Sequence, residues 1–325
     1  MADLEKTPGG PAGAPAAPGG PPPEAIRAVP VRHYGRWVGA AVVLALLGLL
    51  VWAFANAEIS WEVVGDHLTY DTILEGAGKT LWITLLSMVI GVVLGLTLAV
   101  MRLSRNPVLA GTAWGYIWFF RGTPVLVQLF LWYNLALVFD TLDVGFYRDE
   151  MNDVMTPFLA ALLGLGLNEA AYMAEIARAG ILSVDEGQTE AAHALGMSGA
   201  KTMRRIVLPQ AMRVIVPPTG NEFINMLKTS SLVYVINYTE LFRAQDIISS
   251  RNLAVMELLM VATAWYLVLT TVFSIGQYYL ERYYARGSQR ALPPTPWQRV
   301  RAQLTSVRAG GRVPAVGEVR KERSR

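Results

Sequence analysis

The chain has 325 residues, of which 53% are hydrophobic and only 16% are charged. Soluble domains carry about 25% charged residues, and the apolar residues here lie in long uncharged runs, so we expect an integral membrane protein. The net charge of +3 gives no case for nucleic-acid binding, and the lack of cysteine excludes disulfides and thiolate metal sites. The three histidines lie far apart and show no metal-ligand spacing.

Both ends of the chain are expected to be disordered. Residues 1–34 are rich in proline, glycine and alanine, a composition that cannot bury a core. This segment is not predicted to be a signal peptide, because acidic and proline residues precede the first apolar run by a long way. Residues 286–325 are basic and contain prolines, which favours contact with anionic lipid at the cytoplasmic surface.

About six membrane spans are predicted from the apolar runs. They cover approximately residues 37–55, 80–101, 124–139, 157–179, 214–238 and 258–280. Arginines precede the first span, which lies in an additional N-terminal segment, 35–57, so the N-terminus is predicted to be cytoplasmic. The amphipathic segment 57–78 and the acidic loop 140–156 then fall outside, and the C-terminus falls inside. Gly91 and Gly95 form a small-xxx-small pair that would let a neighbouring helix approach closely.

The polar stretch 187–209 carries an ordered series that reads EAA, three residues, Gly, nine residues, Ile-x-Leu-Pro. Its members are Glu190, Ala191, Ala192, Gly196, Ile206, Leu208 and Pro209. The composition predicts a short helix, a left-handed turn at Gly196, and a second helix capped by Ser198. The spacing resembles the EAA loop of the membrane subunits of ABC importers. An ordinary solvated helical hairpin is the alternative, and the full spacing favours the coupling loop.

Three further sequence segments resemble motifs of the polar amino acid permeases of ABC importers. They are FRGTPVLVQLFLWYN from Phe120, AYMAEIARAG from Ala171, and NEFINMLKTSSL from Asn221. The resemblance covers residues 70–285 and implies an all-α domain of the type I permease kind with a cytoplasmic coupling loop at 181–213. The chain departs from the family pattern at Thr229, where an acidic residue is expected, and Lys228 therefore lacks a carboxylate partner within this turn.

The resemblance implies a function as well as a fold. The chain would be the non-catalytic permease subunit of an ATP-binding cassette importer for a polar amino acid of the glutamate, glutamine, histidine or arginine class. It would work by alternating access in a homo- or heterodimer in the bacterial inner membrane, with an external binding protein that delivers the substrate. ATP and Mg would bind a partner ATPase, and this chain would hold no cofactor or metal. The residues implied in coupling to the ATPase are Glu190, Ala191, Ala192 and Gly196.

Polar and charged residues in the fourth and fifth predicted spans form the candidate substrate path. They are Asn168, Glu169, Tyr172, Glu222, Asn225 and Lys228. Ionisable groups at membrane depth are costly and usually face a cavity or a partner. A zwitterionic ligand needs acceptors for its ammonium group and donors for its carboxylate, and this set supplies both. A structural polar network between packed helices is the alternative for each residue.

Other functions fit the sequence less well. The series from Gly76 to Thr80 resembles the end of a phosphate-binding loop, but Ile73 stands where the first glycine is required. An ion-coupled secondary transporter would use Glu169 and Glu175 as a relay, and a structural or signalling membrane protein is a further alternative, but neither explains the EAA spacing. An ABC permease for another small solute, such as an opine, a sulfur compound or an osmolyte, also fits. Arg121 is expected either to anchor the chain at the membrane surface or to bind carbonyl groups freed at the break that follows it.

Overall fold

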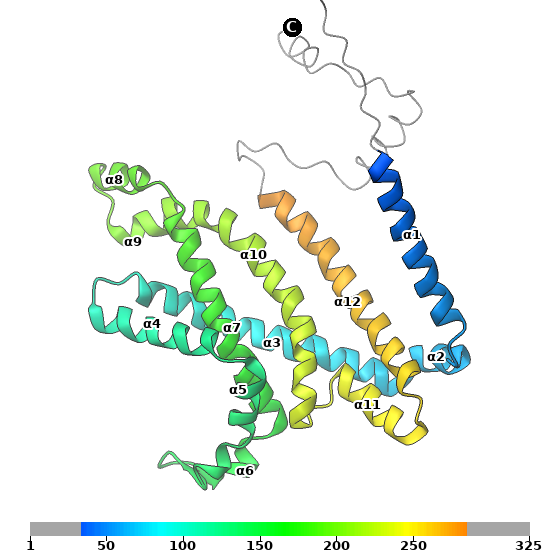
Figure 1. Ribbon diagram of the computed structural model, residues 1–325. Coiled ribbons are helices and arrows are strands. Elements are labelled where there is room, and N and C mark those ends of the chain that lie inside the picture. The colour runs from blue at the N-terminus through cyan, green and yellow to red at the C-terminus, as the bar shows by residue number, and fades with distance from the viewer. Residues whose placement is uncertain (1–33, 285–325) are drawn as a thin grey trace, which may run out of the picture. The chain divides into compact units, whose positions relative to one another are not determined.

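The computed structural model describes residues 34–284 (Figure 1). The expectations for the two terminal tails fall on residues 1–33 and 285–325, which lie outside the described residues. The chain divides into two compact units, Met1–Glu58 and Ile59–Arg325, and each is described by itself.

The first unit contributes one described helix, α1 (Tyr34–Ala55), which corresponds to the predicted additional N-terminal span. Its 22 residues carry no charge after Arg36. At 1.5 Å per residue this helix is about 33 Å long, enough to cross the hydrocarbon core of a bilayer.

Four helices of the described part are long and apolar enough to cross a membrane: α1, α3 (Asp71–Arg102), α7 (Pro157–Leu182) and α12 (Val255–Tyr284). The last three contain the predicted second, fourth and sixth spans. Helix α3 begins at Asp71, earlier than predicted, and the amphipathic segment before it forms the short helix α2 (Trp61–Leu68). The uncharged run therefore underestimates the length of α3, because the first turns of this helix contain charged residues. Two of them, Glu75 and Lys79, lie on its exposed side and form an ion pair of 2.7 Å.

The predicted third span, 124–139, is not a single helix. Helix α4 (Pro107–Gly122) ends before Pro124, and α5 (Val125–Tyr133) is followed by the 3-10 turn η1 (Leu135–Leu137). Nine residues rise only about 14 Å, less than half of the hydrocarbon thickness. The break has a steric cause, because the ring of Pro124 disfavours the helical conformation at the preceding residue, whose backbone is extended.

The acidic outer loop contains a short antiparallel hairpin of β1 (Thr141–Asp143) and β2 (Arg148–Glu150), followed by α6 (Met151–Val154). Gly145 has φ +85°, and its amide donates to the Asp143 carboxylate at 2.9 Å, so the tight turn is closed locally. Figure 1 shows this loop at the end of the second unit opposite α8.

The predicted fifth span, 214–238, begins inside α10 (Leu208–Thr229) and continues as a 3-10 helix, η3 (Ser230–Ile236). Asn237 takes the left-handed conformation, φ 60°, and turns the chain into α11 (Leu241–Asn252). Asparagine tolerates this conformation better than most residues, which explains the turn at this position.

Residues of the predicted coupling loop form two short helices, α8 (Glu186–Ala194) and α9 (Gly199–Thr202). A π-helical turn, η2 (Met203–Val207), joins α9 directly to α10. Figure 1 shows α8 and α9 at one end of the second unit.

The core of the second unit is built on the contact between α3 and α7. A Cβ atom added at Gly95 of α3 would lie 2.5 Å from the Met173 Cβ and 2.9 Å from the Ala170 carbonyl oxygen of α7. A Cβ atom added at Gly91 would lie 2.5 Å from the Cγ of Glu169. The predicted small-xxx-small pair therefore does allow close approach, and its partner is the helix that carries the candidate carboxylate.

Candidate functional site

A cavity of about 850 Å³ lies between the elbow that joins α4 to α5, the middle of α7 and the second half of α10. All six residues of the candidate substrate path line it: Asn168, Glu169, Tyr172, Glu222, Asn225 and Lys228. The three α10 residues are three positions apart, which is why one side of the helix presents all of them. Helix α7 supplies the others because it packs against α10.

Charges of both signs line the cavity. Glu169 and Glu222 supply carboxylates, and Arg121 and Lys228 supply cations. Glu169 is buried, with 4% of its surface exposed, and its Oε1 atom has no hydrogen-bond partner among the described residues. A buried acceptor without a donor is costly, so Glu169 offers a favourable place for the ammonium group of a ligand.

The elbow at the edge of the cavity is held by two amide side chains. The Gln128 Nε2 atom donates to the carbonyl oxygens of Phe120, at 3.0 Å, and Thr123, at 3.1 Å. The Asn168 Nδ2 atom donates to the same Phe120 oxygen, at 2.9 Å, and to the Gln128 Oε1 atom, at 3.2 Å. The carbonyl groups freed by Pro124 are therefore satisfied inside the protein, as membrane depth requires. For Asn168 these bonds agree with the structural alternative.

Sequence reasoning missed Gln128, although a signal was present. It is the one amide in the apolar run of α5, and it is 2% exposed. A buried amide in such a run needs hydrogen-bond partners, and the nearest free carbonyl groups are those at the helix break just before α5.

Of the two roles expected for Arg121, the binding of the elbow carbonyls is filled by other residues. Gln128 and Asn168 bind the elbow carbonyls, and the Arg121 guanidinium lies 5.3 Å from the centroid of the Tyr172 ring, on the cavity lining. This cation–π contact keeps a positive charge in the cavity, and Arg121 forms no ion pair with any described residue. Glu175, one turn beyond Tyr172, pairs with Arg178 at 2.9 Å and does not line the cavity.

Lys228 has an exposed side chain and no carboxylate within 4 Å in residues 34–284. Its neighbour Thr229 also lines the cavity but cannot pair with it. Lys228 is therefore an ammonium donor whose charge is unpaired in this structure.

The turn that ends α8 depends on Gly196. Its φ is +75°, its amide donates to the His193 carbonyl oxygen at 2.9 Å, and the Met197 amide donates to the Ala192 oxygen at 3.0 Å. Nothing lies within 4 Å of an added Cβ at Gly196, so backbone conformation and not space requires a glycine here. Ser198 does occupy the position before α9, but its side chain makes no capping bond, and that predicted cap is wrong.

The EAA residues face two ways. Ala192 is buried, whereas Glu190 and Ala191 are exposed. Leu195, which no motif indicated, is 83% exposed at the end of α8. The short helix therefore presents a small residue, a carboxylate and a large apolar side chain away from the protein.

A second polar cluster joins α11 to its neighbours. Glu240 is fully buried, and its carboxylate accepts from the backbone amides of Phe242 and Arg243, both at 2.9 Å, and from the Tyr266 hydroxyl of α12 at 2.8 Å. The Thr80 hydroxyl of α3 lies 3.4 Å from the same carboxylate. Burial raises the pKa of Glu240 to about 7, against the hydrogen bonds that lower it. Glu240 therefore links three helices through one side chain.

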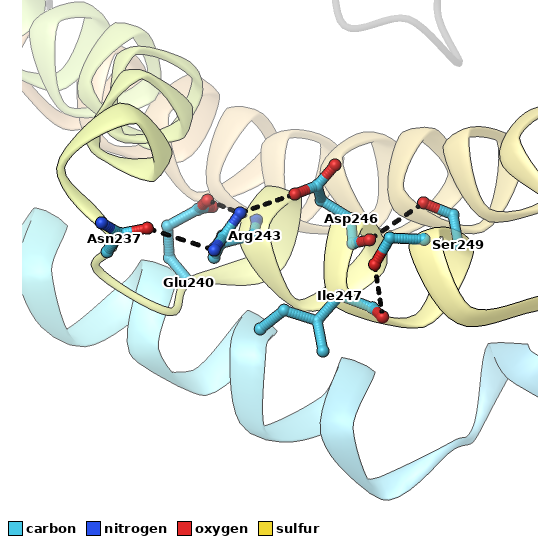
Figure 2. Close-up of polar contacts among 7 residues, drawn as sticks. Asn237, Glu240, Arg243, Asp246, Ile247 and Ser249 are labelled. Atoms are coloured by element: carbon cyan, nitrogen blue, oxygen red, sulfur yellow. Dashed lines mark hydrogen bonds and ion pairs between the residues drawn. The ribbon is translucent and has the colours of Figure 1, made fainter.

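The side chain of Arg243 does not neutralise Glu240. Figure 2 shows it bonded to the Asp246 carboxylate, at 2.7 Å, and to the Asn237 side-chain oxygen, at 3.1 Å. Glu240 caps the backbone of α11 instead, which leaves its carboxylate stabilised by hydrogen bonds alone.

Residues 91–286, more than half of the chain, match the family described as "Binding-protein-dependent transport system inner membrane component". The chain belongs to this family. The prediction of a permease subunit of an ABC importer, with an all-α membrane domain, is thereby confirmed.

Individual relatives of this permease have named substrates. It is 51% identical over 274 residues to the arginine transport system permease protein ArgU of Corynebacterium glutamicum, covering 83% of this chain and 86% of that protein. It is 38% identical over 208 residues to the nopaline transport system permease protein NocM of Agrobacterium fabrum, covering 63% and 85%. A crystal structure of an amino acid ABC transporter with histidines has a chain 40% identical to it, with a TM-score of 0.58, covering 65% of this chain and 94% of that one.

Proposed function

We propose that this permease imports a polar amino acid through the cavity between the elbow, α7 and α10, and that L-arginine is the first ligand to test. The observation that carries the proposal is the pair of carboxylates, Glu169 and Glu222, facing the same cavity as two cations, Arg121 and Lys228. An amino acid presents an ammonium group and a carboxylate, and a cavity with both signs of charge complements it. The 51% identity to an arginine transport permease supports the choice of ligand.

L-arginine suits this arrangement because it carries two cationic groups. The α-ammonium and the guanidinium each require an acceptor, and Glu169 and Glu222 supply one each. Its single carboxylate requires donors, and Lys228 is unpaired among the described residues. Arginine guanidinium groups also stack on aromatic faces, and Tyr172 offers one on the cavity lining.

An opine is the second candidate, because a nopaline transport permease is 38% identical to the chain. Nopaline carries more carboxylate groups than L-arginine, and the second cation, Arg121, would have to leave Tyr172 to bind one of them. Competition between labelled L-arginine and unlabelled nopaline in the assembled transporter distinguishes the two ligands.

Coupling to ATP belongs to the proposal as well. A separate ATPase subunit with ATP and Mg would dock on α8, where Glu190, Ala191 and Leu195 are exposed and Gly196 sets the exit of the chain. A second permease subunit would complete the membrane unit, and a binding protein would deliver the ligand to the opposite side. Both termini would then be cytoplasmic, and hydrolysis would take place only in the partner.

The carboxylate of Glu169 provides the direct test. In proteoliposomes with the full complex and ATP on the ATPase side, Glu169→Gln should lower ATP-dependent L-arginine uptake at least about tenfold, since a hydrogen bond to a charged group is worth roughly 1.5–3 kcal/mol. Glu175→Gln is the matched control, because it makes the same change on the same helix outside the cavity lining. Equal uptake by the Glu169→Gln complex and the wild type would remove Glu169 from the path.

The glycine at the end of α8 tests the coupling. Gly196→Val should abolish stimulation of the ATPase by the loaded binding protein, because a β-branched residue resists a φ of +75°. Gly199→Val is the control, since Gly199 lies three residues on, also has open space around it, and has no positive φ. Retention of full stimulation by Gly196→Val would contradict the coupling role, and uptake without any ATP would favour a secondary transporter.

Single cysteines test the orientation, because the chain has none of its own. With an impermeant thiol reagent in intact cells, a cysteine at position 143 in the hairpin should react and a cysteine at position 198 should not. The reverse pattern, or labelling at both positions, would overturn the proposed topology.

A further inference from the structure

A second, smaller cavity lies against the first. It has a volume of about 280 Å³, and Lys228 and Ser231 line both cavities. Its other walls come from α11 and α12, and they are Phe242, Leu259, Ala262, Thr263 and Tyr266. Lys228 therefore stands at the boundary of the two cavities and is, within residues 34–284, the one charged residue that lines the smaller cavity.

The three hydroxyl groups that line the smaller cavity can only accept further hydrogen bonds. The Ser231 hydroxyl donates to the Lys228 carbonyl oxygen at 2.7 Å, and the Thr263 hydroxyl donates to the Leu259 carbonyl oxygen at 2.7 Å. The Tyr266 hydroxyl donates to the Glu240 carboxylate at 2.8 Å. A hydroxyl group has one hydrogen, so each of these oxygens retains only lone pairs to offer. Such a wall suits an ammonium group and rejects a carboxylate.

The charge behind this wall has the same preference. Glu240, bonded to Tyr266, is fully buried, and no cationic side chain of residues 34–284 lies within 4 Å of its carboxylate. When this carboxyl group is ionised, its field adds to the attraction of the hydroxyl oxygens for a cation. Lys228 has a flexible four-carbon stem and three rotatable donors, and it has no competing carboxylate beside it.

We propose that Lys228 alternates between the two cavities and thereby sets the affinity of the larger one for a ligand carboxylate. In one position its ammonium group binds the carboxylate of the ligand. In the other it is held by the hydroxyl oxygens of Ser231, Thr263 and Tyr266, and the larger cavity loses that donor. The inference rests on the proposed function for the ligand, but the second position exists without one.

Thr229, where the family pattern has an acidic residue, leaves Lys228 free to move between the two cavities. An acidic residue at that position would hold the Lys228 ammonium group beside its own helix. With threonine there, Lys228 has the hydroxyl oxygens of η3 and α12 as acceptors in the smaller cavity, and the polar lining and a bound ligand as acceptors in the larger one. The apparent affinity of the larger cavity for the ligand is then its intrinsic affinity multiplied by the fraction of time that Lys228 spends in that cavity.

The first experiment needs no ligand. Amine groups of the assembled complex in nanodiscs are labelled by brief reductive methylation, and the extent at Lys228 is measured by mass spectrometry relative to Lys79, which is paired with Glu75. Thr263→Val removes one acceptor from the smaller cavity. If Lys228 spends about half its time there, the variant should raise the labelling of Lys228 about twofold.

The control is a matched threonine on the same helix. Thr270 donates to a carbonyl oxygen one turn back, that of Tyr266, at 2.7 Å, as Thr263 does, but it lines neither cavity. Thr270→Val should therefore leave the labelling ratio unchanged. Equal ratios in the wild type and in Thr263→Val would overturn the proposal, and so would a rise of the same size in Thr270→Val.

The second experiment follows the ligand carboxylate. Calorimetry on the complex without its binding protein should show that Thr263→Val tightens L-arginine binding about twofold and leaves binding of agmatine, which lacks the carboxylate, unchanged. Adding Lys228→Met should abolish that difference. A wild-type complex that binds no L-arginine would refute the proposed ligand, whereas the labelling ratio would still decide whether Lys228 alternates. Tighter binding of both compounds would contradict the role of Lys228.

Discussion

Helices α7 and α12 are both long and apolar enough to cross a membrane, and the less apolar of the two is the more deeply buried. Helix α7 buries twelve of its 26 residues, and α12 buries six of its 30. Nine of the twelve on α7 are alanine or glycine, whereas the exposed side of α12 carries large aliphatic residues such as Leu267, Val268 and Val272. Lipid accepts large apolar side chains as well as a protein interior does. Burial in this protein is therefore decided by small size and by polar partners.

The largest effect is expected where a small residue of α3 meets α7. Gly95→Leu would drive a side chain into the backbone of α7, where the Ala170 oxygen and the Ala174 nitrogen lie 2.9 and 3.0 Å from the added Cβ. Backbone atoms cannot rotate away, so we expect loss of the folded complex, measured as the yield of monodisperse protein in detergent. Gly276→Leu on α12 is the control, because nothing lies within 4 Å of its added Cβ. Similar yields for the two variants would contradict the conclusion that the contact with α7 requires small residues whereas the exposed side of α12 does not.

A pair of leucine truncations compares the two helices directly. Leu165 of α7 is fully buried, so Leu165→Ala should destabilise the protein by about 2–5 kcal/mol through the cavity that it leaves. Leu267 of α12 is 61% exposed, so Leu267→Ala should change stability by less than about 0.5 kcal/mol. Thermal unfolding of the two purified variants measures the difference, and equal losses would show that exposed α12 residues are buried in the assembly.

Glu240, which joins α11 to α12, should make stability depend on pH. Its pKa is about 7 in the folded protein against 4.5 for a free carboxyl, so the folded state binds the proton more tightly. This contribution is complete below about pH 4.5 and is lost as pH rises through 7, by up to about 3 kcal/mol. Glu240→Gln should flatten the change in Tm between pH 5 and pH 8. An unchanged pH profile would show that Glu240 is ionised throughout.

The smallest effect is expected at a buried hydroxyl of α3. The Thr84 Oγ1 atom has no hydrogen-bond partner within the described residues, so Thr84→Val should be neutral or stabilise the protein by up to about 1 kcal/mol. Thr80→Val is the contrasting variant, because the Thr80 hydroxyl donates to the Gly76 carbonyl oxygen and accepts from the Leu241 amide. It should lower the Tm. A loss at Thr84 as large as that at Thr80 would point to a partner contributed by another subunit.

The features that the sequence predicts well depend on neighbouring residues. The turn at Gly196 needs only one backbone angle, and the grouping of Glu222, Asn225 and Lys228 needs only helical spacing. The α3 glycines were likewise recognisable, because two small residues four apart mark a place of close helix contact. Each of these signals lies within a single turn or a single helix.

Features that depend on distant residues could not be predicted. Gln128 and Asn168 are forty residues apart, and no local pattern shows that both bind the Phe120 carbonyl oxygen. The third span was predicted too long for the same reason, because apolar residues after Tyr133 look helical until the chain turns into the hairpin. The smaller cavity beside Lys228 requires α10, α11 and α12 to be placed together, which spacing along one helix does not determine.

The π-helical turn η2 determines how α10 is rotated about its own axis. A π turn accommodates one more residue than an α turn, and each residue of an α-helix turns the chain by about 100°. This single residue therefore sets the angular phase of all of α10, including the side that carries Glu222 and Lys228. If this turn tightened to α-helical pitch, α10 would rotate about its own axis, and the charged residues that line the cavity would turn away from it.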